Sequence, residues 1–192
     1  MDSSTAKSLL RFLRWPEQLK DTLRSAHTSE GRRESVAAHT WRLCLLALLL
    51  REEYSNIDFA RLITICIVHD LGEALEGDVP APQQMADEPN GTGKAERERR
   101  DLLALIEPLP GPLQEEITAL WDEYEAASTP EAQLAKGLDK LETLLQHTEG
   151  DNPPDFDYAF NLDYGRKYTS QDPKLDALRE VIDAETRRLA KE

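Results

Sequence analysis

Three polar residues follow directly on a strongly apolar segment. Residues 62–68 are nearly all apolar, and His69, Asp70 and Glu73 come next. At helical spacing His69 and Glu73 continue one apolar stripe and Asp70 continues the adjacent one, so these polar groups should gather at one end of a buried helix. A buried carboxylate without a partner is costly, so the cluster needs a cation, a hydrogen-bond donor or water. The pattern indicates either a metal site or a structural His–Asp pair.

A second histidine occupies the apolar face of another predicted helix. His39 shares a stripe with Val36 and Leu43 at steps of three and four, so it should face the core. One such histidine is usually a structural core residue. Two of them on two apolar helices, one followed by aspartate, favour a metal site. Neutral imidazole with carboxylate suits Zn, Mn, Co or Fe better than Ca or Mg.

A further metal ligand should come from elsewhere in the chain, and periodicity does not choose it. Asp139 is a candidate, although it lies on the flank of the apolar stripe of its own predicted helix. A surface aspartate that pairs with Lys136 or Lys140 would explain the same pattern. On the residues alone, both interpretations stay open.

The elements that would position these groups are helical. Alternating β-branched runs, which are typical of strands, are almost absent. The segments around 43–50 and 62–68 are apolar on nearly all sides, which is typical of buried central helices. Residues 77–93 are rich in Pro, Gly and Asn and predict a loop. The predicted helices cover residues 5–14, 16–24, 35–54, 58–75, 94–107, 112–127, 129–147 and 173–191.

Length and composition limit the class of protein. The 192 residues suit one domain, and 40% hydrophobic with 31% charged residues is typical of a globular chain. We expect a single domain over residues 1–192, with 155–192 as a C-terminal extension of unassigned role. The net charge of -14 argues against a nucleic-acid partner, and two cysteines exclude a disulfide framework. The longest apolar run is too short to cross a bilayer, so we expect no membrane partner and a cytoplasmic location.

The ordered set of His39, the pair His69-Asp70 and Asp139 resembles the signature of the HD-domain metal-dependent phosphohydrolases. Further segments resemble the bacterial 5'-deoxynucleotidase branch of that superfamily. They are LKDTLR at 19–24, ESVAAH at 34–39, HDLGEALEGD at 69–78, LWDEYE at 120–125 and LAKGLDKLE at 134–142.

The resemblance implies a fold, a reaction and a set of roles. The fold would be the all-α HD bundle of about seven helices. The reaction would be hydrolysis of the phosphate monoester of (deoxy)ribonucleoside 5'-monophosphates by a metal-activated water. Glu73 and Asp78 would serve the water and the proton transfers, and Arg24 would bind the substrate phosphate. The ligands of one divalent metal per chain (Co, Mn, Zn or Fe) would be His39, His69, Asp70 and Asp139.

Other functions are compatible with the same residues. In the deoxynucleotidase an aromatic residue follows the phosphate-binding arginine and helps to select the sugar, whereas Ser25 stands there in this chain. The alternatives are an HD-type hydrolase of another phosphate ester or of a nucleoside triphosphate, and a non-catalytic nucleotide-binding HD scaffold. Members of the branch are often dimers, so a homodimer is expected.

Overall fold

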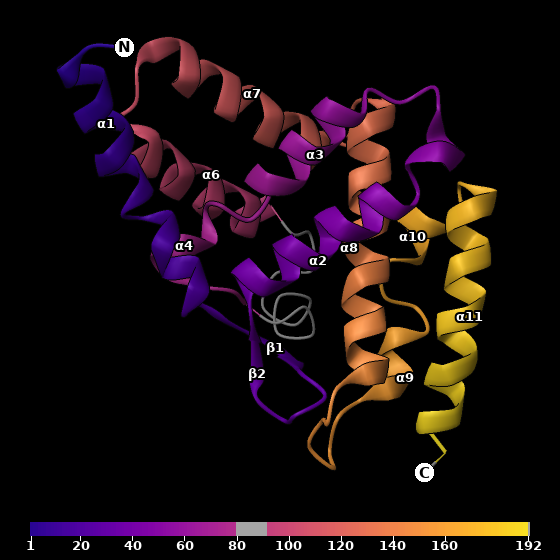
Figure 1. Cartoon of the computed structure of the whole chain (residues 1–192). Coiled ribbons are helices and arrows are strands. Elements are labelled where there is room, and N and C mark those ends of the chain that lie inside the picture. Colours follow the sequence, from indigo (N-terminus) through magenta and orange to yellow (C-terminus); the bar gives the residue numbers. More distant parts are fainter. Residues whose placement is uncertain (80–91, 192) are drawn as a thin grey trace.

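The computed structural model describes residues 1–79 and 92–191, and this part of the chain is mainly helical (Figure 1). Its helices of ten residues or more are α1 (Ser3–Leu13), α2 (Val36–Leu49), α3 (Phe59–Val68), α6 (Thr92–Ile106), α7 (Gly111–Ala126), α8 (Pro130–Glu149) and α11 (Pro173–Leu189). The shorter helical segments are η1 (Pro16–Lys20), η2 (Arg51–Tyr54), α4 (Glu73–Glu76), α9 (Tyr158–Asn161) and α10 (Arg166–Thr169). The all-α fold class is confirmed, and seven long helices in the described residues agree with the expected number.

Helix α8 is the centre of the fold. Helices α2, α3, α7, α10 and α11 all contact it, and Figure 1 shows it between α2 and α11. Thirteen of its 20 residues are buried, among them the charged residues Lys136, Asp139 and Glu142. The two helices predicted to be buried on all sides expose apolar side chains instead, with Trp41 of α2 67% and Ile67 of α3 53% exposed. That prediction is wrong, because a high apolar content does not determine which helix is covered on every face.

A β-hairpin takes the place of part of the helix predicted over residues 16–24. The chain forms η1 and then strand β1 (Leu23–His27), which pairs antiparallel with β2 (Arg33–Ser35). The Arg33 guanidinium donates hydrogen bonds to the carbonyls of Leu23 and Arg24, at 2.9 and 2.8 Å. An isolated two-stranded hairpin is marginal, but here β1 packs on α8 and β2 on α2. Tertiary contacts therefore determine the conformation of this segment, and they direct the side chain of Arg24 toward α8.

The helix predicted over residues 58–75 is broken where the polar cluster begins. Helix α3 ends at Val68, His69 is its C-cap, and α4 starts at Glu73. Between them the backbone makes tight turns, such as the hydrogen bond from the Glu73 amide to the Asp70 carbonyl at 3.0 Å. A Cβ atom on Gly72 would lie only 2.6 Å from the Glu98 carbonyl oxygen, so glycine lets α6 approach this turn.

The C-terminal segment packs on the side of α8 opposite to α2. Helices α10 and α11 contact α8, and α9 contacts α11. Gly165 has a φ of +70°, and a Cβ atom there would lie 2.7 Å from the Cβ of Lys140. The segment to which the sequence assigns no role thus supports the helix that carries Asp139.

Two other expectations concern features outside the long helices. The loop predicted over residues 77–93 lies largely outside the described residues; its start, residues 77–79, is not helical, and its end, from Thr92, begins α6. None of the described helices combines the length and apolar character needed to cross a membrane.

Candidate metal centre and active site

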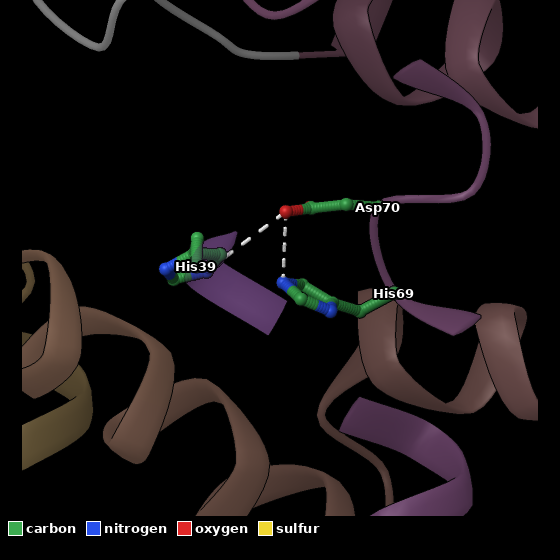
Figure 2. A group of neighbouring side chains, drawn as sticks. All are labelled: His39, His69 and Asp70. Carbon is green, nitrogen blue, oxygen red and sulfur yellow. Dashed lines mark ion pairs between the residues drawn. The ribbon is translucent and has the colours of Figure 1, made fainter. Parts of the chain in front are cut away.

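Two imidazole rings and one carboxylate meet between α2 and the end of α3. His39 comes from the first turns of α2, and His69 and Asp70 come directly after α3 (Figure 2). The Asp70 Oδ2 atom lies 3.0 Å from His69 Nε2 and 3.9 Å from His39 Nε2. One ligand atom of each residue lies within 4.8 Å of those of the other two, which is close enough to share one cation.

Both histidines turn an unpartnered nitrogen toward the centre of this group. His69 Nδ1 lies 2.8 Å from the Cys66 carbonyl, and His39 Nδ1 is hydrogen-bonded to Glu142. Because a carbonyl and a carboxylate only accept, each neutral ring carries its proton on Nδ1 and keeps a lone pair on Nε2. Both Nε2 atoms are buried and have no hydrogen-bond partner. A divalent cation would satisfy both lone pairs, so the donor set fits a metal.

Asp139 adds a carboxylate beside His39 from α8, although it lies outside the compact group of His39, His69 and Asp70. Its Oδ1 atom lies 3.2 Å from His39 Nε2. Its Oδ2 atom accepts hydrogen bonds from Tyr124 Oη and from Lys140 Nζ, both at 2.8 Å. Asp139 therefore does pair with Lys140, but it is buried and not on the surface. One oxygen is held by α7 and α8, and the other is directed at the imidazoles.

The four carboxyl groups of the site fall into two pairs. Burial would raise the pKa of Asp70, but the neighbouring His69 more than offsets it, and in the same way Lys140 holds the pKa of Asp139 well below its usual range. Such groups are ionised and suited to bind a cation.

The second pair, Glu73 and Asp78, behaves in the opposite way. Burial and the charges of Asp70 and Asp78 raise the pKa of Glu73 well above its usual range. Burial also raises the pKa of Asp78, although the cations Arg24 and Lys94 oppose it. Carboxyl groups whose environments separate their pKa values in this way are suited to divide metal binding from proton transfer.

Arg24 reaches this region from strand β1. Its Nη2 donates to Thr143 Oγ1 at 2.9 Å, and its Nη1 lies 3.4 Å from Glu34 Oε2 and 3.7 Å from Glu142 Oε2. Burial would lower its pKa, but these carboxylates raise it, so the guanidinium keeps its charge. On the residues alone, a surface charge at the end of the predicted helix is the simpler interpretation of Arg24, and only the resemblance implies a phosphate-binding role; the structure places it partly buried beside α8.

Several charged residues of this region were not singled out from the sequence. Glu142 and Glu34 lie around Arg24, and Lys94 of α6 lies 3.6 Å from Glu73 Oε1 and 3.0 Å from Glu98 Oε1. Glu34 and Glu142 lie at the ends of the segments 34–39 and 134–142 that carry the resemblance, and the i,i+4 spacing of Lys94 and Glu98 indicates a pair. No periodic signal marks the others, because they are charged residues on helices or strands whose partners are distant in the sequence.

Comparison with known proteins identifies the class to which this architecture and site belong. A family model for the HD domain matches residues 16–179, and the chain belongs to this family. A solved structure from Magnetospirillum magnetotacticum, described as a predicted metal-dependent phosphohydrolase, superposes with a TM-score of 0.80 at 28% identity and covers 98% of each chain. A conserved hypothetical protein from Pyrococcus furiosus superposes with a TM-score of 0.63 at 29% identity, covering 88% of this chain and 99% of its own.

The relatives within the family carry a more specific name. The 5'-deoxynucleotidase HDDC2 of Bos taurus is 37% identical over 151 residues, which is 78% of this chain and 71% of the relative. The human 5'-deoxynucleotidase HDDC2 is 34% identical over 146 residues, 75% of this chain and 69% of the relative. The resemblance to HD-domain phosphohydrolases and to 5'-deoxynucleotidases is thereby confirmed, and membership of this family implies a divalent metal.

Proposed function

We propose that this protein is a metal-dependent phosphomonoesterase that hydrolyses (deoxy)ribonucleoside 5'-monophosphates. The observation that carries the proposal is the pair of buried, unpartnered Nε2 atoms of His39 and His69, which face carboxylate oxygens of Asp70 and Asp139. The similarity to the 5'-deoxynucleotidases supports the choice of substrate class. Two imidazoles and two carboxylates suit Co, Mn, Zn or Fe, and we propose one such ion per chain.

The ligands would be His39, His69, Asp70 and Asp139, and the protein already orients three of them. The Cys66 carbonyl orients His69, Glu142 orients His39, and Tyr124 with Lys140 orients Asp139. When bound, a divalent cation supplies a water with a pKa near neutrality and polarises a phosphoryl oxygen. Prepositioned ligands keep the cost of assembling such a site low.

Glu73 and Asp78 would move the protons of the reaction. Water attacks phosphorus, the bond from phosphorus to the 5' oxygen breaks, and one proton leaves the water while one reaches the departing nucleoside oxygen. Burial raises the pKa of both carboxyl groups, so each holds a proton more readily than a free carboxyl group does. Glu73 also has Lys94 at 3.6 Å, which limits the upward shift.

Arg24 would hold the phosphate of the substrate. A guanidinium offers five N–H donors, and the hydrogen bonds to Thr143 and Glu34 use two of them. The fixed contacts with Glu34 and Thr143 would orient the remaining donors, so less freedom is lost when phosphate binds.

Phosphate release from a substrate panel tests the proposal. The purified full-length chain is incubated with Co, Mn or Zn and with nucleoside 5'-monophosphates, their deoxy counterparts and triphosphates. We expect inorganic phosphate from the monophosphates. If only triphosphates are cleaved, the protein is a nucleoside triphosphate hydrolase and the proposal is wrong. If nucleotides bind tightly but no metal-loaded sample cleaves them, a non-catalytic scaffold is favoured.

We also propose that the protein is a homodimer that pairs through α2. The exposed positions of this helix are Trp41, Leu45, Leu48 and Leu49, all apolar. A chain with a net charge of -14 repels a second copy wherever acidic surfaces meet, and this face carries no acidic residue. Sedimentation of the wild type should give a dimer mass, and Leu48→Glu should give a monomer; a monomeric wild type would contradict the proposal.

A further inference from the structure

Glu142 is a fully buried carboxylate that contacts both halves of the proposed site. Its Oε2 atom accepts the hydrogen bond from His39 Nδ1, and the same oxygen lies 3.7 Å from Arg24 Nη1. His39 Nε2, at the other side of the ring, faces Asp139 and Asp70. One oxygen atom thus lies between an imidazole of the candidate metal centre and the candidate phosphate-binding guanidinium.

The cluster around Glu142 already contains its cation. Oxygen and nitrogen atoms of Glu34, His39 and Glu142 come within 4.8 Å of one another and could by themselves hold a metal ion. The Arg24 guanidinium, however, lies 3.4 Å from Glu34 and 3.7 Å from Glu142. On the far side, Arg42 Nε lies 3.4 Å from Glu142 Oε1. Two arginines therefore balance the two glutamates, which indicates a positioning cluster and not a second metal site.

We propose that Glu142 is a positioning residue that couples the metal centre to the phosphate-binding Arg24. Because its carboxylate only accepts, it keeps the proton of His39 on Nδ1 and leaves the Nε2 lone pair for the metal. The same negative charge holds Arg24 beside the site. The coupling to phosphate rests on the proposed function, whereas the effect on metal affinity does not.

Three single substitutions separate the two contacts of Glu142. Glu142→Gln keeps the shape and removes the charge from both contacts. Thr143→Val removes the 2.9 Å hydrogen bond to Arg24 and leaves His39 untouched. Glu149→Gln is the matched control, because Glu149 is on the same helix and pairs with the same Arg42, at 2.9 Å, without contacting His39 or Arg24.

The first measurement is the dissociation constant of Zn²⁺ or Mn²⁺ for the metal-free full chain, obtained by competition with a chelator. Glu142→Gln should weaken metal binding by about 10- to 100-fold, the usual effect of losing a carboxylate behind a ligating histidine. Thr143→Val and Glu149→Gln should leave it unchanged. Equal metal affinity in Glu142→Gln and Glu149→Gln would overturn the proposal.

The second measurement is the KM for a nucleoside 5'-monophosphate at saturating metal. Glu142→Gln and Thr143→Val should each raise it by about tenfold, the loss expected when a charge-assisted contact to the phosphate is misplaced. An unchanged KM in Glu142→Gln would overturn the coupling. If the wild type binds metal but cleaves no nucleotide, the proposed function fails, and the metal measurement still decides the role of Glu142 toward His39.

Folding is monitored by circular dichroism and thermal unfolding for every variant. If Glu142→Gln does not fold, Glu142→Asp keeps the charge and withdraws the oxygen from His39 by one methylene. This variant should weaken metal binding in the same direction while retaining the thermal transition. A folded Glu142→Asp with wild-type metal affinity would overturn the proposal.

Discussion

Among the residues that the structure describes, two clusters of buried charged side chains differ in how completely their atoms are partnered. In the first, Arg179 and Asp183 of α11 are both fully buried, and Arg179 Nε donates to Asp183 Oδ1 at 2.6 Å. The remaining guanidinium nitrogens of Arg179 donate to the carbonyls of Tyr164 and Asn161, and Arg166 bonds the other oxygen of Asp183. Each charged group there is matched by protein atoms, so this cluster holds α9, α10 and α11 together.

The second cluster, around His39 and His69, is also buried, but not all of its polar atoms have a hydrogen-bond partner. Both Nε2 atoms lack a hydrogen-bond partner, while their Nδ1 atoms are fixed. Leaving such atoms unpaired costs stability unless a ligand satisfies them. The difference shows that buried charge does not by itself mark a functional site; what distinguishes the second cluster is a pair of unpartnered imidazole nitrogens that face carboxylates.

The largest expected difference between the clusters is in activity. Asp70→Asn removes a proposed ligand and should lower phosphate release by about a thousandfold or more, since metal catalysis supplies several kcal/mol of barrier lowering. The free energy of unfolding of the metal-free protein should change less than in a variant of the first cluster, because the side chain of Asp70 is 21% exposed whereas that of Asp183 is fully buried. Phosphate release and denaturant unfolding of the metal-free protein check both points. Undiminished turnover would show that Asp70 is not a ligand of the catalytic metal.

The matching substitution in the fully partnered cluster should act on stability. Arg179→Met leaves Asp183 buried without its main partner and should reduce the free energy of unfolding by about 3–5 kcal/mol. The metal affinity of the folded fraction should stay at the wild-type value. Denaturant titration and metal competition are the measurements, and a variant that unfolds like the wild type would contradict the structural role of this cluster.

Metal addition should stabilise the protein only through the incomplete cluster. At a free concentration of about 100 times the dissociation constant, the ion should add about 2.7 kcal/mol to the free energy of unfolding, because it binds the folded state. The gain should vanish in Asp139→Asn and persist in Arg179→Met. Thermal unfolding with and without Mn²⁺ checks this, and a gain that survives in Asp139→Asn would place the ion elsewhere.

The smallest expected effect concerns a buried histidine outside the metal centre. His147 lies on α8 with Nδ1 3.0 Å from Asn161 Oδ1, and burial lowers its pKa to about 4. The imidazole of His147 takes up a proton near pH 6.5 in the unfolded chain but only near pH 4 in the folded chain. The free energy of unfolding should therefore fall as the pH drops from about 6.5 to about 4. His147→Gln should reduce the loss between about pH 6.5 and about pH 5 by about 2 kcal/mol. Unfolding curves at both pH values check it, and equal pH dependence in the variant would contradict it.

Periodicity is sufficient to predict that a polar residue is buried when its neighbours on the same face of the helix are apolar. His39 lies in a stripe with Val36 and Leu43, and His69 follows the apolar run of α3, so the sequence alone assigns both to the interior, where they lie. The helical class and most element positions follow from the same patterns. The break after Val68 has no such signal, because it depends on the close approach of α6 at Gly72.

The sequence by itself thus determined that the stripes carrying His39 and His69 are buried and which polar residues interrupt them. Only the tertiary structure decided that the polar flank of α8, with Asp139 and Glu142, is buried as well, and that Arg24 lies on a strand facing it. The stripes that carry His39 and His69 are buried as their own residues predict, although other apolar residues of α2 stay exposed. A polar flank is equally stable in water or among matching charges, and only the elements packed across it determine which of the two it meets.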